Sequence, residues 1–229
     1  MFYYYGRKKK IAKFYPAPLY DIIVEPFAGS AAYSLYGENW KKEVILIEKD
    51  SRVCEIWDWL IDEATSESIL KLPILQVGEK SSEFLHIIHA VTKMAFKFKT
   101  IKVTPVLARN WEISRRVMAA SLHKVKHWKI HCSDYNTAPD IEATWFIDPP
   151  YKSSPGMGYH HSSNDLDYQE LASWTTSRKG QIIFCEGEFG DYLPFVNLTD
   201  MPGVAGKYNT EKIFYRGNGQ IVQQELLFV

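Results

Sequence analysis

Residues 21–37 read DIIVEPFAGSAAYSLYG, and this stretch decides the fold class. It begins with a short apolar run, residues 21–25, of the kind that forms a buried β-strand. A turn of small residues around Gly29 follows, and the residues beyond it are expected to form a helix that Gly37 closes. The stretch therefore predicts a strand, a tight turn and a helix, which is the usual beginning of an open α/β sheet.

The same alternation continues along most of the chain. Short apolar runs predict further strands, and the spacing of apolar residues in 51–64 predicts a helix. The predicted strands are EVILIEKD (43–50), KIHCSD (129–134), ATWFID (143–148) and GQIIFCE (180–186), and the tail has two strand-like runs about the Gly217-Asn218-Gly219 turn. We therefore predict a mostly parallel, doubly wound, Rossmann-like sheet with an antiparallel C-terminal hairpin.

Residues 65–128 interrupt this pattern. They show helical periodicity and little strand character, so we expect a sheet domain, formed by 1–64 and 129–229, with a helical insertion, 65–128. The insertion is basic, although the whole chain has a formal net charge of zero. Residues 90–131 contain a single acid, Glu112, and ten bases, which are Lys93, Lys97, Lys99, Lys102, Arg109, Arg115, Arg116, Lys124, Lys126 and Lys129. Such an excess predicts contact with a polyanion, whereas a balanced charge run is usually a solvated surface.

The composition narrows the class of protein. The 229 residues are 46% hydrophobic and 14% aromatic, which suits a large core and argues against disorder. No apolar run approaches the roughly 20 residues of a membrane-spanning helix, and the N-terminus lacks the order of a secretory signal. Cys54, Cys132 and Cys185 have no disulfide or zinc spacing. We expect a cytoplasmic protein without a metal site, in which the cysteines are small buried residues.

The segment ATWFIDPPYKS, residues 143–153, ends an apolar strand with an aspartate and two prolines. Because prolines cannot continue a sheet ladder, Asp148 is expected at the carboxyl end of that strand. Open α/β sheets bind their ligands outside the carboxyl ends of the strands. Asp148 is therefore the first candidate for a functional site.

The Gly29 turn stands where a dinucleotide enzyme has a glycine-rich phosphate cradle, but Gly29 is the single glycine in this turn. Glu25, at the end of the preceding strand, is unfavourable beside a phosphate. A cationic nucleoside without phosphates fits better, and S-adenosyl-L-methionine has that chemistry. Glu48 ends the second strand, where an acid binds ribose hydroxyls. Asp134 and Tyr135 end the third strand and are expected to hold the adenine of the cofactor by a hydrogen bond and by stacking.

Five segments together resemble, in order, the motifs of the Dam-like DNA adenine-N6 methyltransferases, and more closely the small phage-type members. They are YYYGRKKKIAKFYP for the N-terminal segment, VEPFAGSAA for the cofactor loop, LIEKD for the ribose-binding strand end, HCSDYN for the adenine-binding segment and DPPY for the catalytic motif. The similarity covers most of the chain apart from 65–128. Arg7 and Ala31 depart from it, because the family usually has glycine at these two places.

The resemblance implies the fold of the class I S-adenosylmethionine-dependent methyltransferases, in a bacterial or phage-infected cell, and it assigns roles to residues. Lys8 would bind the carboxylate of the cofactor, with Tyr5 packed near it. The full cofactor-binding set is Tyr5, Lys8, Glu25, Phe27, Gly29, Ser30, Glu48, Asp134, Tyr135 and Asp148, and the catalytic set is Asp148, Pro149, Pro150 and Tyr151.

The implied reaction has to activate the N6 amine of adenine, whose lone pair is delocalised into the ring. The Asp148 carboxylate and the backbone carbonyl of Pro149 would accept hydrogen bonds from the two N–H groups and stabilise the positive charge that develops on the nitrogen. Tyr151 would stack on the target base after the base has rotated out of the duplex. Neither a metal nor a covalent enzyme intermediate is required.

The resemblance also implies that double-stranded DNA is the partner and that residues 65–128 form a target-recognition subdomain. Residues 152–168 are a candidate lid over the extruded base. The DNA-binding candidates are Lys97, Lys99, Arg109, Asn110, Arg115, Arg116, Lys124 and Tyr159.

Other functions stay open at this point. Methylation at cytosine C5 is disfavoured, because it needs a cysteine nucleophile in a Pro-Cys context and none of the three cysteines follows a proline. Cytosine N4, an RNA base or a protein amide presents the same planar nitrogen as adenine. A non-catalytic DNA-binding protein with this fold would keep the basic insertion, and a nicotinamide enzyme would need the missing phosphate cradle.

Overall fold

The computed structural model describes residues 1–2, 4, 6–80, 102–153, 156–202, 208–217 and 220–221. Within these residues the chain forms an eight-stranded sheet in the order β3-β2-β1-β4-β5-β7-β6, with β8 paired to β7 outside this path. The strands are β1 (Ile22–Glu25), β2 (Glu43–Glu48), β3 (Lys129–Cys132), β4 (Glu142–Ile147), β5 (Lys179–Glu186), β6 (Val196–Pro202), β7 (Tyr208–Gly217) and β8 (Gln220–Ile221).

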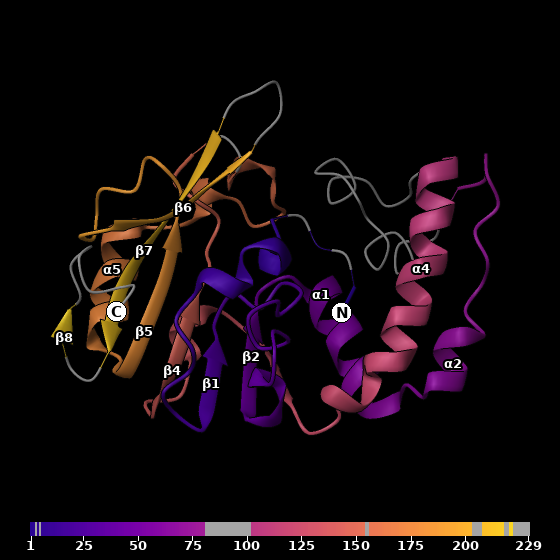
Figure 1. The fold of residues 1–229 in the computed structure, drawn as a ribbon, viewed down its shortest axis with the longest axis horizontal. Helices are drawn as coiled ribbons and strands as arrows, with labels where there is room; N and C mark the ends of the chain where they lie inside the picture. The colour runs from indigo at the N-terminus through magenta and orange to yellow at the C-terminus, as the bar shows by residue number, and fades with distance from the viewer. Residues whose placement is uncertain are drawn as a thin grey trace.

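The first five strands of the chain are parallel, and β7 is antiparallel to β5, β6 and β8 (Figure 1). This mostly parallel, Rossmann-like sheet with an antiparallel end is the architecture that the sequence predicted. The chain runs outward from β1 through β2 to β3 and then returns to β4 on the other side of β1. The strand order therefore reverses between β1 and β4, which is where ligands bind in open α/β sheets.

Each central parallel strand is buried because both faces of the sheet are covered. One face packs against α1 (Ser51–Asp58), which continues as a π-helical turn, Trp59–Glu63, and the other packs against α5 (Tyr168–Ser177). The alternation in β2 shows this division, since Val44 and Leu46 belong to the α1 side and Ile45 and Ile47 to the α5 side. The 3₁₀ turns are Lys8–Lys10, Ala12–Phe14, Asn39–Lys41, Leu122–Lys124, Tyr135–Thr137, Gly156–Gly158 and Ser163–Asp165.

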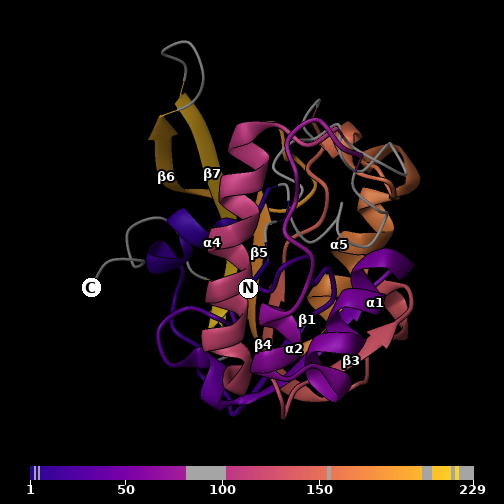
Figure 2. The same ribbon diagram turned by 90° about the vertical axis from the view of Figure 1, so that its right-hand side faces the viewer.

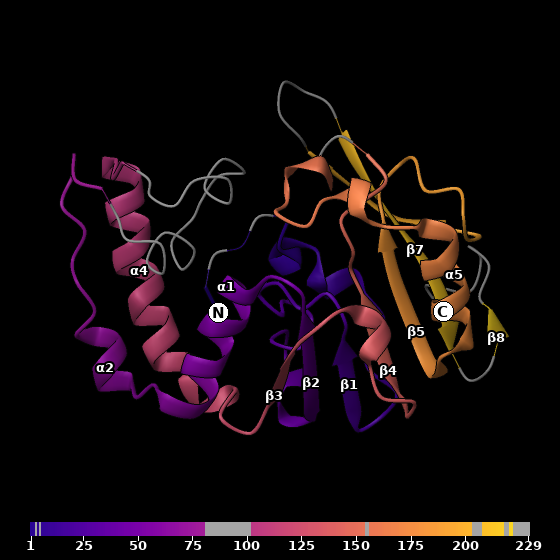
Figure 3. The same ribbon diagram turned by 180° about the vertical axis from the view of Figure 1, so that it is seen from behind.

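The predicted insertion contributes α2 (Ser66–Leu70) and α4 (Pro105–Ser121), which contact each other. Figures 1 and 3 show both helices at one end of the molecule, with β8 at the opposite end, and Figure 2 shows α4 in front of the strands. Trp111 and Met118 of α4 are fully buried in the same hydrophobic cluster as Ile23 and Leu46 of the sheet. The described part of the insertion therefore shares its core with the sheet; residues 81–101 lie outside the described residues.

One local prediction is wrong. The helix expected after Gly29 is replaced by turns, because Gly29 and Ala31 both have positive φ, of 46° and 48°, and the Ser34 N–H donates to the Glu25 carboxylate instead of continuing a helical ladder. The predicted C-terminal hairpin is present, because β7 pairs antiparallel with β8 at Arg216–Ile221 and Gly217–Gln220. Strand β6, which pairs antiparallel with the other edge of β7, was not predicted. No helix among the described residues is long and apolar enough to cross a membrane.

Candidate active site

One pocket lies at the carboxyl ends of β1, β2 and β4. Glu25 and Glu48 are the last residues of β1 and β2, and Asp148 directly follows β4, so three strand ends each bring a carboxylate to this edge. The predicted site residues that line the pocket are Lys8, Glu25, Phe27, Gly29, Ser30, Glu48, Asp134, Tyr135, Asp148, Pro150 and Tyr159. Tyr5 lies outside the described residues. The pocket therefore brings together predicted residues from six separate segments of the chain.

The Gly29 turn forms the floor of the pocket and is fixed from three sides. Its N–H donates to Glu48 Oε2 at 2.9 Å, and its carbonyl accepts from Trp57 Nε1 at 2.8 Å. A Cβ on Gly29 would lie 2.9 Å from the ring of Tyr4, and the φ of 46° is a left-handed conformation that favours glycine. The turn can therefore present bare backbone to a ligand only with glycine at this position.

Glu48 is held in a single position by backbone donors. Its Oε1 accepts from the Asp50 N–H at 2.9 Å while Oε2 accepts from Gly29, and its side chain is buried. Burial raises the pKa of Glu48 to about 7, against the opposing effect of these two N–H donors. Each oxygen keeps a second lone pair, so the carboxylate can still accept from a pair of neighbouring hydroxyls.

Two aromatic rings stand beside Glu48 in the pocket. Phe27 and Tyr135 are stacked, with ring centroids 5.4 Å apart and an interplanar angle of 24°. Asp134, which precedes Tyr135, forms an ion pair with Lys49 at 2.7 Å, and all four residues line the pocket. This arrangement offers an apolar ring surface next to a carboxylate, which suits a planar heterocycle.

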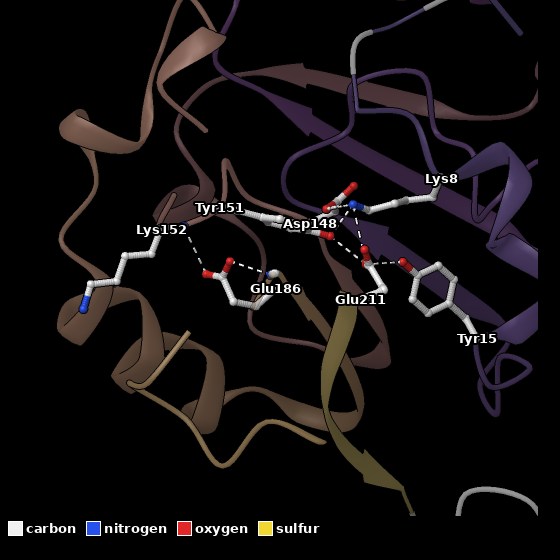
Figure 4. Close-up of polar contacts among 8 residues, drawn as sticks. Lys8, Tyr15, Asp148, Tyr151, Lys152, Glu186 and Glu211 are labelled. Atoms are coloured by element: carbon white, nitrogen blue, oxygen red, sulfur yellow. Dashed lines mark hydrogen bonds and ion pairs between the residues drawn. The ribbon is translucent and has the colours of Figure 1, made fainter. Parts of the chain in front are cut away.

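Asp148 is paired with a cation from the N-terminal segment. Lys8 Nζ lies 3.0 Å from Asp148 Oδ1 and 3.5 Å from Oε1 of Glu211, a residue of β7, and Lys8 also donates to the Tyr151 hydroxyl (Figure 4). The Lys8 ammonium therefore already has three oxygen partners beside Asp148, and its contact with a cofactor carboxylate stays a prediction. Lys8 places the 3₁₀ turn Lys8–Lys10 next to Asp148.

The charges in this cluster depend on one another. Burial raises the pKa of Asp148 to about 6; Lys8 acts in the opposite direction and Glu211 adds to the increase. Burial alone would lower the pKa of Lys8, but the carboxylates of Asp148 and Glu211 outweigh it and hold that pKa above its ordinary value. At neutral pH the cluster therefore contains an ionised Asp148 beside a permanently charged ammonium.

The remaining residues of the DPPY motif are also fixed. The Tyr151 hydroxyl donates to Glu211 Oε1 at 2.6 Å, and the Pro150 carbonyl accepts from the Tyr168 hydroxyl at 2.8 Å. The Tyr151 ring packs over Gly187, whose Cβ, if added, would lie 3.0 Å from it. The motif is therefore anchored to β7, to the residue that follows β5 and to α5, while Pro149 is buried.

Tyr159 lies at the pocket rather than on a separate surface. Its ring centroid is 6.1 Å from that of Tyr4, and it contacts Gly6, where an added Cβ would collide with its hydroxyl. Because Tyr4 in turn lies against Gly29, the N-terminal segment and the loop after the DPPY motif meet above the Gly29 turn. Tyr159, predicted to bind DNA, is therefore placed to cover a ligand in the pocket.

The structure gives Arg115 a role different from the predicted one. Its guanidinium is buried, donates to the carbonyls of Leu70 at 2.6 Å and Leu72 at 2.9 Å, and forms an ion pair with Glu112 at 2.5 Å. It therefore ties α4 to the end of α2 and is not available to read a base. The helical periodicity of the segment could have placed Arg115 on the apolar side, together with Trp111 and Met118.

The other predicted DNA-binding residues lie apart from the pocket. Arg109 and Arg116 are exposed on α4, Asn110 is half-buried, and Lys124 lies over the ring of Trp40 at 5.5 Å. Lys97 and Lys99 lie outside the described residues. The described candidates thus offer two exposed cations on α4 for a partner.

Glu211 is the site residue that the sequence analysis missed. It is buried on β7 beside the DPPY motif and accepts from Tyr15 and Tyr151. The two-residue period of strands could have indicated that Glu211 is buried, since it shares a face of β7 with buried Ile213 and is an acid in an otherwise apolar position.

The three cysteines were expected to be buried. Cys54 and Cys185 are buried, whereas Cys132 is exposed.

No family model matches this chain, and no curated protein matches it. A solved structure that does match is named "Putative methyltransferase yhhF from Escherichia coli". It is 12% identical to this chain with a TM-score of 0.35, and the match covers 86% of this chain and 75% of the other. The functional assignment therefore rests on the geometry of the pocket.

Proposed function

We propose that this protein is an S-adenosylmethionine-dependent methyltransferase that acts on the N6 amine of adenine in DNA. The observation that carries the proposal is that Asp148 of the DPPY motif opens into the same pocket as the Gly29 turn. A methyl donor held on the turn would then face an acceptor amine held by Asp148. The alternative methyltransferase functions, with cytosine N4, an RNA base or a protein amide as the acceptor, would use the same pocket, whereas a non-catalytic DNA-binding protein would need no cofactor in it.

The lining of the pocket supports this cofactor. The carboxylate of Glu48 stands at the end of β2 for ribose hydroxyls, and the stacked rings of Phe27 and Tyr135 offer a surface for adenine. Acids outnumber bases in the lining, which contains Glu25, Glu48, Asp50, Asp134, Asp148 and Asp165 as well as Arg7, Lys8 and Lys49. The excess remains at neutral pH, although burial raises the pKa of Glu25 to about 8 and keeps it largely protonated. Such a lining is unfavourable for a pyrophosphate and suits a cationic sulfonium. When bound, S-adenosylmethionine supplies an electrophilic methyl group.

The residues of the DPPY motif account for activation of the acceptor. The Asp148 carboxylate accepts one amine N–H and the Pro149 carbonyl accepts the other, so that the nitrogen lone pair is drawn out of conjugation and the growing positive charge is stabilised. Lys8 is bonded to Oδ1 of Asp148, which orients the carboxylate and leaves Oδ2 for the acceptor. Fixing the carboxylate in this way contributes to catalysis by positioning, which is worth up to roughly 7 to 11 kcal/mol in favourable systems.

Exposed cations near the pocket support a polyanionic acceptor. Lys9, Lys10 and Lys13 are exposed on the two consecutive 3₁₀ turns that follow Gly6, and Lys8 at the start of the first turn reaches Asp148. A base that has rotated out of a duplex keeps its phosphates close to the pocket mouth, where such ammonium groups can contact them. Arg109 and Arg116 are two further exposed cations, on α4 and apart from the pocket.

The test is to incubate the protein with DNA and isotope-labelled S-adenosylmethionine, digest the DNA to nucleosides and determine their masses. The proposal predicts labelled N6-methyldeoxyadenosine. Label in N4-methyldeoxycytidine would mean that the acceptor is cytosine and not adenine. The proposed mechanism would still apply, because the lone pair of that amine is also delocalised into the ring. Absence of label from DNA, with labelled RNA or protein in parallel reactions, would contradict DNA as the substrate.

A further inference from the structure

Glu211 brings three separate parts of the chain together behind Asp148. Its Oε1 accepts from the Tyr15 hydroxyl at 2.6 Å and from the Tyr151 hydroxyl at 2.6 Å, and it lies 3.5 Å from Lys8 Nζ (Figure 4). These partners come from the segment before β1, from the DPPY motif and from the N-terminal turn, while Glu211 itself comes from β7. The activation chemistry described above assigns no role to this residue.

A carboxylate in this place is costly unless its partners compensate for it. Glu211 is buried, and burying an unpaired carboxylate costs several kcal/mol or more. Two hydroxyl donors and one ammonium meet that requirement, and the same ammonium is bonded to Asp148 and to the Tyr151 hydroxyl. Lys8 is thus held between two carboxylates, and its position depends on both of them.

We propose that Glu211 is a positioning residue of the active site, which holds Lys8 against Asp148 and sets the orientation of the Tyr151 ring. Without Glu211 the Lys8 ammonium would follow Asp148 alone and could bridge both of its oxygens, including the one that the acceptor amine needs. The Tyr151 hydroxyl would also lose the partner that fixes its ring over Gly187. The catalytic part of this inference rests on the proposed function, whereas the placement of Lys8 and Asp148 is measurable without turnover.

The electrostatic surroundings of Asp148 make the role measurable. The ionisable groups that act on Asp148 or lie near it are Lys8, Glu25, Glu186, Glu211, Tyr4, Tyr15, Tyr151 and Cys185. Among the charged groups, Glu211 raises the pKa of Asp148 and Lys8 lowers it. Removing the charge of Glu211 should therefore lower the pKa of Asp148, since the opposing effect of Lys8 stays.

Two substitutions separate position from charge. Glu211→Asp keeps the charge but withdraws the carboxylate by one methylene, so we expect kcat for methyl transfer to fall at least about 10-fold, because displacements near 1 Å cost up to about 100-fold. Its Asp148 titration should move less than that of Glu211→Gln, because the charge is kept. Glu211→Gln removes the charge, so kcat should fall and the midpoint of the Asp148 titration should move to lower pH. Cofactor affinity, measured by calorimetry, should stay within about three-fold of wild type in both variants.

The experiment follows the Asp148 side-chain carboxyl by ¹³C NMR in cofactor-free protein, assigned with Asp148→Asn, and measures kcat in parallel. Circular dichroism confirms that each variant is folded, and Glu38→Gln, an exposed glutamate, serves as control. An unmoved Asp148 titration in Glu211→Gln, or wild-type kcat in Glu211→Asp, would overturn the inference. If wild-type protein transfers no methyl group, the proposed function fails, and the titration still decides whether Glu211 acts on Asp148.

Discussion

The ammonium of Lys8 lies 3.0 Å from Oδ1 of Asp148, and both side chains are largely shielded from water. The pair joins the N-terminal turn to the end of β4, at the point where the strand order of the sheet reverses. Because Lys8 also contacts Glu211 and Tyr151, the turn Lys8–Lys10 contributes a buried cation to the candidate site.

Lys8→Met should leave Asp148 and Glu211 without their shared cation. Removing one partner of a buried ion pair costs about 3 to 5 kcal/mol, so we expect a loss of stability of that order in urea unfolding. The pKa of Asp148 should rise above its value of about 6, since the group that lowers it is gone. The pH at which activity reaches half its plateau should move upward. Lys9→Met, at the neighbouring exposed lysine, should change neither the unfolding free energy nor the pH midpoint of activity. Equal effects of the two substitutions would contradict the pairing of Lys8 with Asp148.

Glu25 should make the protein less stable as the pH rises. Burial raises its pKa from 4.5 to about 8, against the hydrogen bonds from Ser34, so the folded state holds a proton that the unfolded state releases above its ordinary pKa. The stabilisation is complete below about pH 4.5 and is lost as the pH rises through about 8. Between about pH 5 and pH 9 the unfolding free energy of wild type should therefore decrease by roughly 2 to 5 kcal/mol more than that of Glu25→Gln. Urea unfolding at both pH values measures this, and parallel pH dependences of the two proteins would refute it.

Arg115 and Arg116 are adjacent and both pair with Glu112, yet they should differ in effect. Arg115→Met removes buried hydrogen bonds to the Leu70 and Leu72 carbonyls and should cost about 2 to 4 kcal/mol of unfolding free energy. Arg116 is 73% exposed, so Arg116→Met should change stability by less than about 0.5 kcal/mol. Chemical denaturation of the two variants gives the comparison. Similar small losses for both would mean that Arg115 does not tie α4 to α2.

Phe27→Ala should weaken cofactor binding without unfolding the protein. The Phe27 ring is half-buried and stacked on Tyr135, and an aromatic contact with a base is worth about 1 to 3 kcal/mol. We expect the dissociation constant for S-adenosylmethionine to increase roughly 5- to 100-fold in calorimetry. Phe189→Ala, at a 65% exposed phenylalanine, is the matched control and should bind as wild type does. An unchanged constant for Phe27→Ala would remove this ring from the cofactor site.

The sequence was informative where short apolar strands end in polar residues. Glu25, Glu48 and Asp148 each follow or end such a run, and parallel strands bring their carboxyl ends to one edge, so residue order alone is enough to group these three carboxylates. The tight turn at Gly29 was also predictable, because a single glycine among small residues after a strand favours a turn. The structure shows that its left-handed φ and its contact with Tyr4 both need a glycine.

The rest depended on contacts between distant segments. Glu211 comes from an antiparallel strand whose pairing partner is not encoded locally, and Lys8 is one of three consecutive lysines that differ only in which side chain the turn directs inward. Arg115 and Arg116 are likewise adjacent in the sequence, and the rotation of α4 decides that one is buried and the other exposed. Residue type and spacing alone do not carry that information.

Single-turnover methyl transfer by Asp148→Ala, with S-adenosylmethionine already bound, tests the central claim most directly. If Asp148 is the acceptor of the amine N–H, the wild-type rate should rise with pH through the Asp148 pKa of about 6. The variant should bind the cofactor with wild-type affinity and transfer the methyl group at least about 100-fold more slowly at every pH. A variant that transfers at the wild-type rate would contradict the assignment of Asp148 and, with it, the proposed mechanism.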